Sequence, residues 1–75
     1  MTRLAEMKPG SGGRVRQIHG DDEISLRLLE MGLTPGVDVR VIGAAPLRDP
    51  LELHLRGYRL SVRKSEAARV ELEEK

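Results

Sequence analysis

The sequence contains no cysteine, phenylalanine or tryptophan, and Tyr58 is its only aromatic residue. Without cysteine, neither a disulfide framework nor a thiolate metal site can stabilise so short a chain. Without further aromatic rings, the platforms on which proteins usually stack single-stranded nucleic acid are missing as well. The core of the fold must therefore be aliphatic, and its stability must come from packing.

Long apolar runs and an excess of one charge are also missing. The longest uninterrupted apolar stretch, residues 41–45, is far shorter than the roughly 20 residues that span a bilayer. The N-terminal residues contain no apolar stretch that would serve as a signal peptide. Thirteen basic and 12 acidic residues leave a formal net charge of +1, whereas nucleic-acid-binding domains are usually strongly basic. We therefore expect a cytoplasmic protein.

The chain has the size and balance of one small globular domain, with 75 residues of which 39% are hydrophobic and 33% charged. We expect a single domain over residues 1–75, with its core at about 4–72. This size excludes most enzymes that are built on large sheets.

Most of the chain alternates apolar and polar residues, which predicts β-strands. Strands are expected at 37–41, 51–55 and 58–62, with Arg56-Gly57 as a two-residue hairpin turn between the last two. This hairpin register pairs Leu55 with Tyr58, Leu53 with Leu60 and Leu51 with Val62. A slip of one residue would expose all six side chains, so the register is well specified.

Shorter strands are expected at 14–18 and 70–72, and a loop that contains two prolines at 45–50. In the first of these strands, the two large apolar residues are three positions apart. A bulge near Gln17 is therefore needed to place both on one face.

One helix is predicted, because Asp21-Asp22-Glu23 supplies an N-cap and an acidic first turn. Three apolar residues of this helix then share one stripe: Ile24, Leu28 and Met31. Gly32 is expected to end the helix in the left-handed conformation, with Leu33 folded back onto the last turn.

These elements predict a mainly-β fold, an SH3-like barrel of five strands that is closed or nearly closed. The helix lies between the first and second strands, and a helical turn at 65–68 precedes the last strand. Closure would remove exposed strand edges, which promote aggregation. Eukaryotic SH3 domains grip proline-rich peptides between aromatic walls, and this chain has no such walls.

No group of residues points to catalysis. The glycine-rich segment 10–13 lacks the Gly-Lys-Ser/Thr ending of a phosphate-binding loop, and no serine lies in a nucleophile elbow. His19 and residues 21–23 are metal-ligand types, but helix capping already explains the acids. His54 is expected on a solvated strand face. We therefore expect no enzyme, no cofactor and no metal site.

A small KOW-like or SH3-like RNA-binding module is the alternative function. Residues 8–20 resemble the short glycine-bounded strand of KOW-type ribosomal and elongation-factor modules. Five basic residues would form the phosphate track: Arg14, Arg16, Arg59, Arg63 and Lys64. The motif is short and aromatic platforms are missing, so a solvated strand face with salt bridges is the simpler account.

A surface that binds another protein is the remaining candidate. Leu26 and Leu29 lie roughly opposite the core-facing stripe of the helix, so at least one of them is expected to be exposed. An apolar spot flanked by Arg27 and Glu30 is a reasonable docking site.

Three segments carry a resemblance to a known family. They are Leu28-Leu29-Glu30-Met31-Gly32-Leu33-Thr34-Pro35-Gly36, then Ala45-Pro46-Leu47-Arg48-Asp49-Pro50, then Gly57 through Arg63 with Glu66-Ala67. In these segments the chain resembles the FeoA family of bacterial ferrous-iron uptake, from about Leu4 to Leu72. Arg48 stands where the family usually has glycine.

The resemblance implies an SH3-like β-barrel without enzymatic activity. It also implies a partner, FeoB, the membrane protein with a cytoplasmic GTP-binding domain that carries Fe(II) inward. The same module forms the C-terminal domain of metal-dependent repressors. No DNA-binding helix-turn-helix precedes it here, so we expect a transport accessory protein that binds no nucleic acid.

We expect this accessory protein to reach the membrane only through FeoB. The expected contacts are Leu26, Arg27, Leu29 and Glu30 on the helix, with Arg59 and Arg63 on the neighbouring basic strand face.

Overall fold

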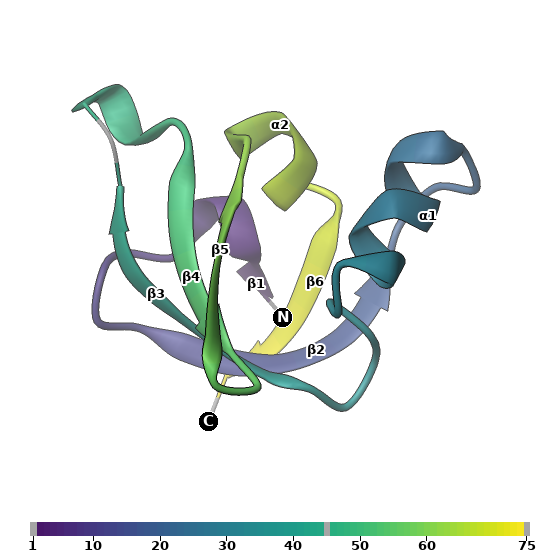
Figure 1. Cartoon of the computed structure of the whole chain (residues 1–75), viewed down its shortest axis with the longest axis horizontal. Coiled ribbons are helices and arrows are strands. Elements are labelled where there is room, and N and C mark those ends of the chain that lie inside the picture. Colours follow the sequence, from purple (N-terminus) through teal and green to yellow (C-terminus); the bar gives the residue numbers. More distant parts are fainter. Residues whose placement is uncertain (1, 45, 75) are drawn as a thin grey trace.

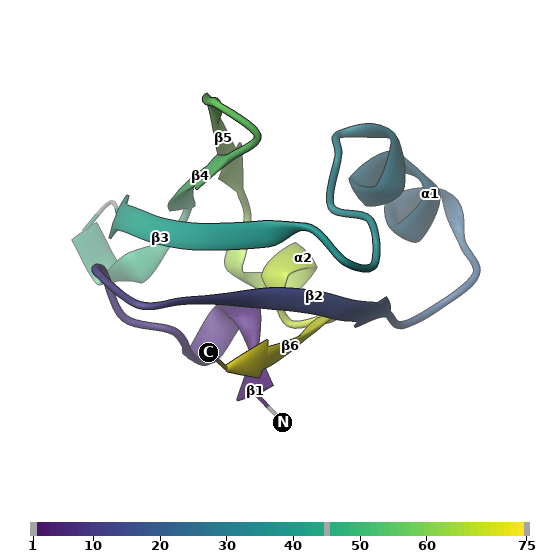
Figure 2. The same ribbon diagram turned by 90° about the horizontal axis from the view of Figure 1, so that it is seen from below.

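The computed structural model describes residues 2–44 and 46–74 and has a mainly-β fold. The strands are β1 (Thr2–Arg3), β2 (Gly12–Ile18), β3 (Asp38–Ala44), β4 (Leu51–Leu55), β5 (Tyr58–Val62) and β6 (Val70–Glu74). The helices are α1 (Glu23–Glu30) and α2 (Lys64–Ala67), and two 3₁₀ turns cover Leu4–Glu6 and Pro46–Arg48. All strand pairs are antiparallel, in the order β1-β6-β2-β3-β4-β5. Figures 1 and 2 show that β4 and β5 stand across the run of β2 and β3, so the sheet curves around an interior.

The structure has six strands where the sequence pattern predicted five. The additional strand is β1, in which Thr2 pairs with Leu72 and Arg3 with Glu71 of β6. Two residues are too few to show an alternating pattern, so this strand is recognisable only from its partner. β1 and β5 stand at the two ends of the strand order, and the ladders of the described residues include none between them.

The predicted bulge in the first long strand is confirmed. The pairing of β2 with β6 shifts register between Val15 and Gln17, so that one extra residue stands on β2. Val15 is fully buried and Ile18 is half-buried against the core. A bulge of this kind bends its strand, which suits the strong curvature of β2 in Figure 1.

Both predicted ends of the helix are confirmed. The side chain of Asp22 accepts a hydrogen bond of 3.2 Å from the backbone N–H of Ser25. At the other end Gly32 has φ +108°. The N–H of Leu33 donates to the carbonyl of Leu28 at 3.1 Å, and that of Gly32 to Leu29 at 3.0 Å. This pair of bonds is the Schellman motif, and it buries Leu33 under the last turn.

The predicted hairpin register is confirmed pair by pair. Leu55 pairs with Tyr58, Leu53 with Leu60 and Leu51 with Val62. Both turn residues have positive φ, +50° at Arg56 and +84° at Gly57, as a primed two-residue turn requires.

Two connecting segments differ in detail from the expectation. The loop predicted at 45–50 contains the 3₁₀ turn Pro46–Arg48, while Ala45 lies outside the described residues. The helical turn predicted at 65–68 is α2, which begins and ends one residue earlier, because Arg63 is its N-cap.

The buried apolar side chains form one cluster without aromatic rings, which confirms the aliphatic core. They are Leu4, Met7, Val15, Leu28, Leu33, Val37, Val39, Val41, Leu51, Leu53, Leu55, Val62, Ala67, Val70 and Leu72. Figure 1 shows α2 between β5 and β6 at one end of the curved sheet, with α1 beside it. The opposite face of α1 is thereby left to solvent.

Candidate partner-binding site

Helix α1 presents two large apolar side chains to solvent. Leu26 is 58% exposed and Leu29 is 36% exposed, whereas Leu28 between them is fully buried. The prediction that at least one of the two leucines is exposed is therefore confirmed. Exposed apolar side chains that lie together on one helix are a common basis for protein recognition.

Glu66 of α2 connects α1 to the residue that precedes α2. Its carboxylate is 9% exposed and forms an ion pair with the guanidinium of Arg27 on α1. The other carboxylate oxygen accepts a hydrogen bond of 3.1 Å from the backbone N–H of Arg63. One buried carboxylate thus links the side chain of Arg27 to the backbone of Arg63, although the two residues are far apart in sequence.

Tyr58 joins the hairpin to the C-terminal end of the helix. Its hydroxyl donates a hydrogen bond to the carbonyl of Met31, and its side chain is 40% exposed. The sequence pattern identified Tyr58 only as a strand residue. Its contact with the helix depends on the curvature of the sheet, which the local sequence does not show.

Arg59 lies apart from the other predicted contact residues. It follows Tyr58 on β5, so it lies on the opposite face of that strand, where it is exposed and pairs with His54 of β4. The structure therefore brings Leu26, Leu29, Arg27 and Glu30 together on α1, and Glu66 links the backbone of Arg63 to Arg27. It places Arg59 on the outer face of the sheet. The exposure predicted for His54 is confirmed.

The acidic residues at the start of α1 take part in structural contacts. The carboxylate of Asp22 lies 2.5 Å from the guanidinium of Arg69, in addition to capping the helix. His19 Nε2 lies 2.8 Å from Glu71 Oε1 on β6, away from these acids. No three histidine, aspartate or glutamate side chains gather as metal ligands within residues 2–44 and 46–74.

The pKa of two of these carboxyl groups is displaced. The hydrogen bond from Arg69, followed by that from the Ser25 N–H, lowers the pKa of Asp22 below its ordinary value. The hydrogen bond with His19 lowers the pKa of Glu71 in the same way. Both groups therefore favour their charged forms in the folded protein.

The lowered pKa of Asp22 predicts a loss of stability in acid. Its contribution is complete above the ordinary aspartate pKa of about 3.9 and disappears as the pH falls through the lowered value. Asp22→Asn keeps a good N-cap but removes the charge. The melting temperature of this variant should lie below that of the wild type at pH 7, and the two should converge at the acid end of a circular-dichroism series. A difference that stays constant with pH would contradict this assignment.

The five basic residues of the alternative phosphate track do not form one continuous surface. Arg14 pairs with Asp38 at 3.5 Å, and Arg16 pairs with Glu71 and Glu73 at 3.2 and 3.1 Å. These arginines lie on β2, whereas Arg59 lies on β5, with β3 and β4 between them in the strand order. Arg63 is the N-cap of α2, and Lys64 is the first residue of that helix. The simpler account, a strand face with salt bridges, is confirmed for β2.

Comparison with known proteins decides the family. The family model described as the FeoA domain matches residues 2–74. The chain belongs to the FeoA family. Among curated proteins, this FeoA-family chain is 35% identical over 71 residues to a Fe(2+) transport protein A/Fe(2+) transporter FeoB fusion protein of Porphyromonas gingivalis. The match covers 95% of the chain but only 8% of the length of that fusion protein.

Solved FeoA structures have the same fold. A FeoA-like protein of Clostridium acetobutylicum is 36% identical, with a TM-score of 0.89 over 99% of this chain and 90% of that one. FeoA of Stenotrophomonas maltophilia, solved in complex with zinc and described as a prokaryotic SH3 domain protein, is 30% identical. Its TM-score is 0.84 over 97% of this chain and 91% of that one. The predicted SH3-like fold and the FeoA resemblance are thereby confirmed.

The FeoA family takes part in ferrous iron transport. In this FeoA-family chain, no helix within the described residues has the length and apolar character needed to cross a bilayer.

Proposed function

We propose that this chain is a non-catalytic, cytoplasmic accessory protein of bacterial ferrous iron uptake that binds the transporter FeoB and modulates Fe(II) transport. The observation that carries the proposal is the Porphyromonas gingivalis relative, in which a FeoA-like segment and FeoB form one polypeptide. Fusion keeps two polypeptides together permanently, which is useful when the separate proteins act as a complex.

The exposed face of α1 is the part of the chain best suited to this contact. Leu26 and Leu29 supply apolar area at its centre, and Arg27, Glu30 and Arg63 supply a charged border. An apolar centre with a polar rim is the usual anatomy of a protein interface. Because Glu66 restrains Arg27 in the free protein, less side-chain entropy is lost on binding. Arg59 lies outside this surface.

Leu26→Asp tests the interface. We expect it to weaken binding to full-length FeoB in nanodiscs by at least tenfold in calorimetric titration, because a carboxylate would be desolvated at the centre of the contact. Leu29→Asp should also weaken binding to FeoB.

Leu47→Asp is the matched control, since Leu47 is a leucine that is 94% exposed on another part of the fold. It should leave the affinity for FeoB unchanged. Equal losses in Leu26→Asp and Leu47→Asp would contradict the α1 interface, and no binding by the wild type would contradict the proposed function itself. Circular dichroism of each variant verifies that it is folded.

A further inference from the structure

The outer face of β3, β4 and β5 carries a row of basic residues. Arg40 of β3 pairs with His54 of β4, and His54 pairs with Arg59 of β5, so these three side chains are cross-strand neighbours on one face. Arg56 adds a fourth basic group at the turn between β4 and β5. All four residues are exposed. We call these four residues the basic sheet face.

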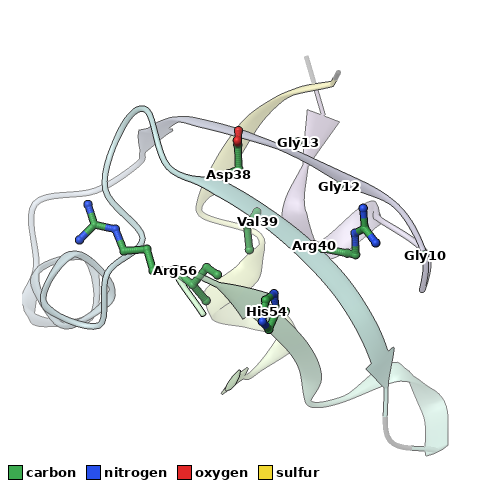
Figure 3. Close-up of a pocket in the computed structure, with 9 residues that line it drawn as sticks. Gly10, Gly12, Gly13, Asp38, Val39, Arg40, His54 and Arg56 are labelled. Atoms are coloured by element: carbon green, nitrogen blue, oxygen red, sulfur yellow. The ribbon is translucent and has the colours of Figure 1, made fainter. Parts of the chain in front are cut away.

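A depression of about 630 Å³ lies on this face. Its lining includes Gly12, Asp38, Arg40, His54 and Arg56. Gly12 is the cross-strand neighbour of Arg40. Because glycine has no side chain, the depression stays open at this end. Figure 3 shows His54 between Arg40 and Arg56, whose guanidinium groups extend to opposite sides.

The arginines of the basic sheet face differ from those of β2 in their ion pairs. Among the side chains that the structure describes, none of the ion pairs includes Arg40, Arg56 or Arg59. The arginines of β2 differ, because each has a carboxylate partner. The one acid that lines the depression, Asp38, lies 3.5 Å from Arg14, which offsets its charge. A second acid, Glu52, is exposed on the same face of β4 as His54. The three arginines of the basic sheet face still outnumber the two acids Asp38 and Glu52.

We propose that the basic sheet face binds the anionic phospholipid headgroups of a membrane surface. Separate guanidinium groups that extend in different directions are poorly arranged to enclose one small phosphate ion. They are well arranged to contact several phosphates spread over a plane. Near an anionic bilayer, each such residue strengthens binding by about fivefold. Bases of single-stranded nucleic acid would need aromatic platforms, and the basic sheet face has none.

A direct lipid contact, which departs from the expectation that the protein reaches the membrane only through FeoB, would orient it beside its partner. A domain that binds a membrane transporter works next to a bilayer. The inference rests on the proposed function in this one respect, because binding to FeoB would bring the chain to the membrane. The basic sheet face and the exposed face of α1 have no residue in common. A headgroup contact is therefore compatible with binding of FeoB through α1.

Sedimentation with lipid vesicles, without FeoB, tests the lipid contact. The intact chain should bind vesicles of phosphatidylcholine with phosphatidylglycerol at low ionic strength, should not bind pure phosphatidylcholine, and should be released by salt. The double variant Arg40→Gln/Arg56→Gln should bind about 25-fold more weakly, as two arginines are lost. The control Arg16→Gln/Lys64→Gln removes the same charge outside the basic sheet face and should lose much less.

Asp38→Asn provides a test by gain of affinity. It removes the negative charge from the depression, so binding to the anionic vesicles should become about fivefold stronger. Equal losses in the two double variants would show that only net charge matters. No gain in Asp38→Asn would show that the charge at this depression does not control binding, and either result would overturn the proposal.

Two further results would also overturn it. One is binding of inorganic pyrophosphate or an RNA oligonucleotide to this face, detected by NMR, in a protein that does not bind anionic vesicles. The other is the absence of vesicle binding in a chain that still binds FeoB, which would leave the proposed function intact.

Discussion

Leu28→Ala is expected to lower the free energy of unfolding by about 3 kcal/mol, a large part of the stability of so small a domain. Leu28 is fully buried in the aliphatic cluster. Truncation removes its transfer free energy and leaves a cavity that branched aliphatic neighbours fill poorly. No aromatic ring is present in the core to move into the space. Urea unfolding followed by circular dichroism measures the loss.

Leu26→Ala is the matched control on the same helix. Leu26 is 58% exposed, and alanine has slightly better helix propensity than leucine. The free energy of unfolding should therefore change by less than about 0.5 kcal/mol. The two substitutions remove the same atoms two residues apart, so similar losses would mean that α1 buries a different face from the one described here.

Gly32→Ala is expected to cost about 2 kcal/mol of stability. Gly32 has φ +108°, a conformation that side chains with a Cβ rarely adopt. A Cβ at this position would also overlap the hydroxyl of Tyr58, which is held by its hydrogen bond to the carbonyl of Met31. Moving the ring away would break that bond. The substitution therefore combines backbone strain with a lost contact between the hairpin and the helix.

Gly36→Ala separates these two costs. Gly36 has φ +95°, but no atom lies within 4 Å of a Cβ placed there. Only the backbone strain remains, and the expected loss is about 1 kcal/mol. Combining Gly32→Ala with Tyr58→Phe should cost less than the sum of the single substitutions, because phenylalanine lacks the overlapping hydroxyl. Chemical denaturation of all four variants measures the coupling. Additive losses would contradict the close approach of Tyr58 to Gly32.

The elements that could be predicted from the sequence are those whose signals are local. The hairpin register follows from the alternation of apolar and polar residues and from the two-residue turn at Arg56-Gly57, in which both residues have positive φ. The helix ends follow from an aspartate cap and a left-handed glycine. β1 was missed because it is too short to carry a pattern, and it exists only because β6 offers it an edge.

The candidate sites were predictable in part, for the same reason. The helical wheel separates Leu26 from Leu28, and burial confirms that separation. By contrast, the wheel says nothing of Glu66. Its carboxylate contacts the side chain of Arg27, 39 positions earlier in the sequence, and the backbone N–H of Arg63. The pairing of Arg40 with His54 depends on the register shift of β3 between Val41 and Gly43, which has no clear signal in the sequence.

Apart from β1, local sequence determined the main secondary-structure elements, the aliphatic character of the core and the membership of the FeoA family, because caps, turns and apolar periodicity act over a few residues. Tertiary structure decided which charges are neutralised and which remain available to a partner. Arg16 and Arg40 look equivalent in the sequence, since each is an outward-facing arginine on a strand. Curvature and strand order place carboxylates of β6 beside Arg16 and basic residues beside Arg40. Charge pairing depends on distances of a few ångströms between segments that only the folded sheet brings together.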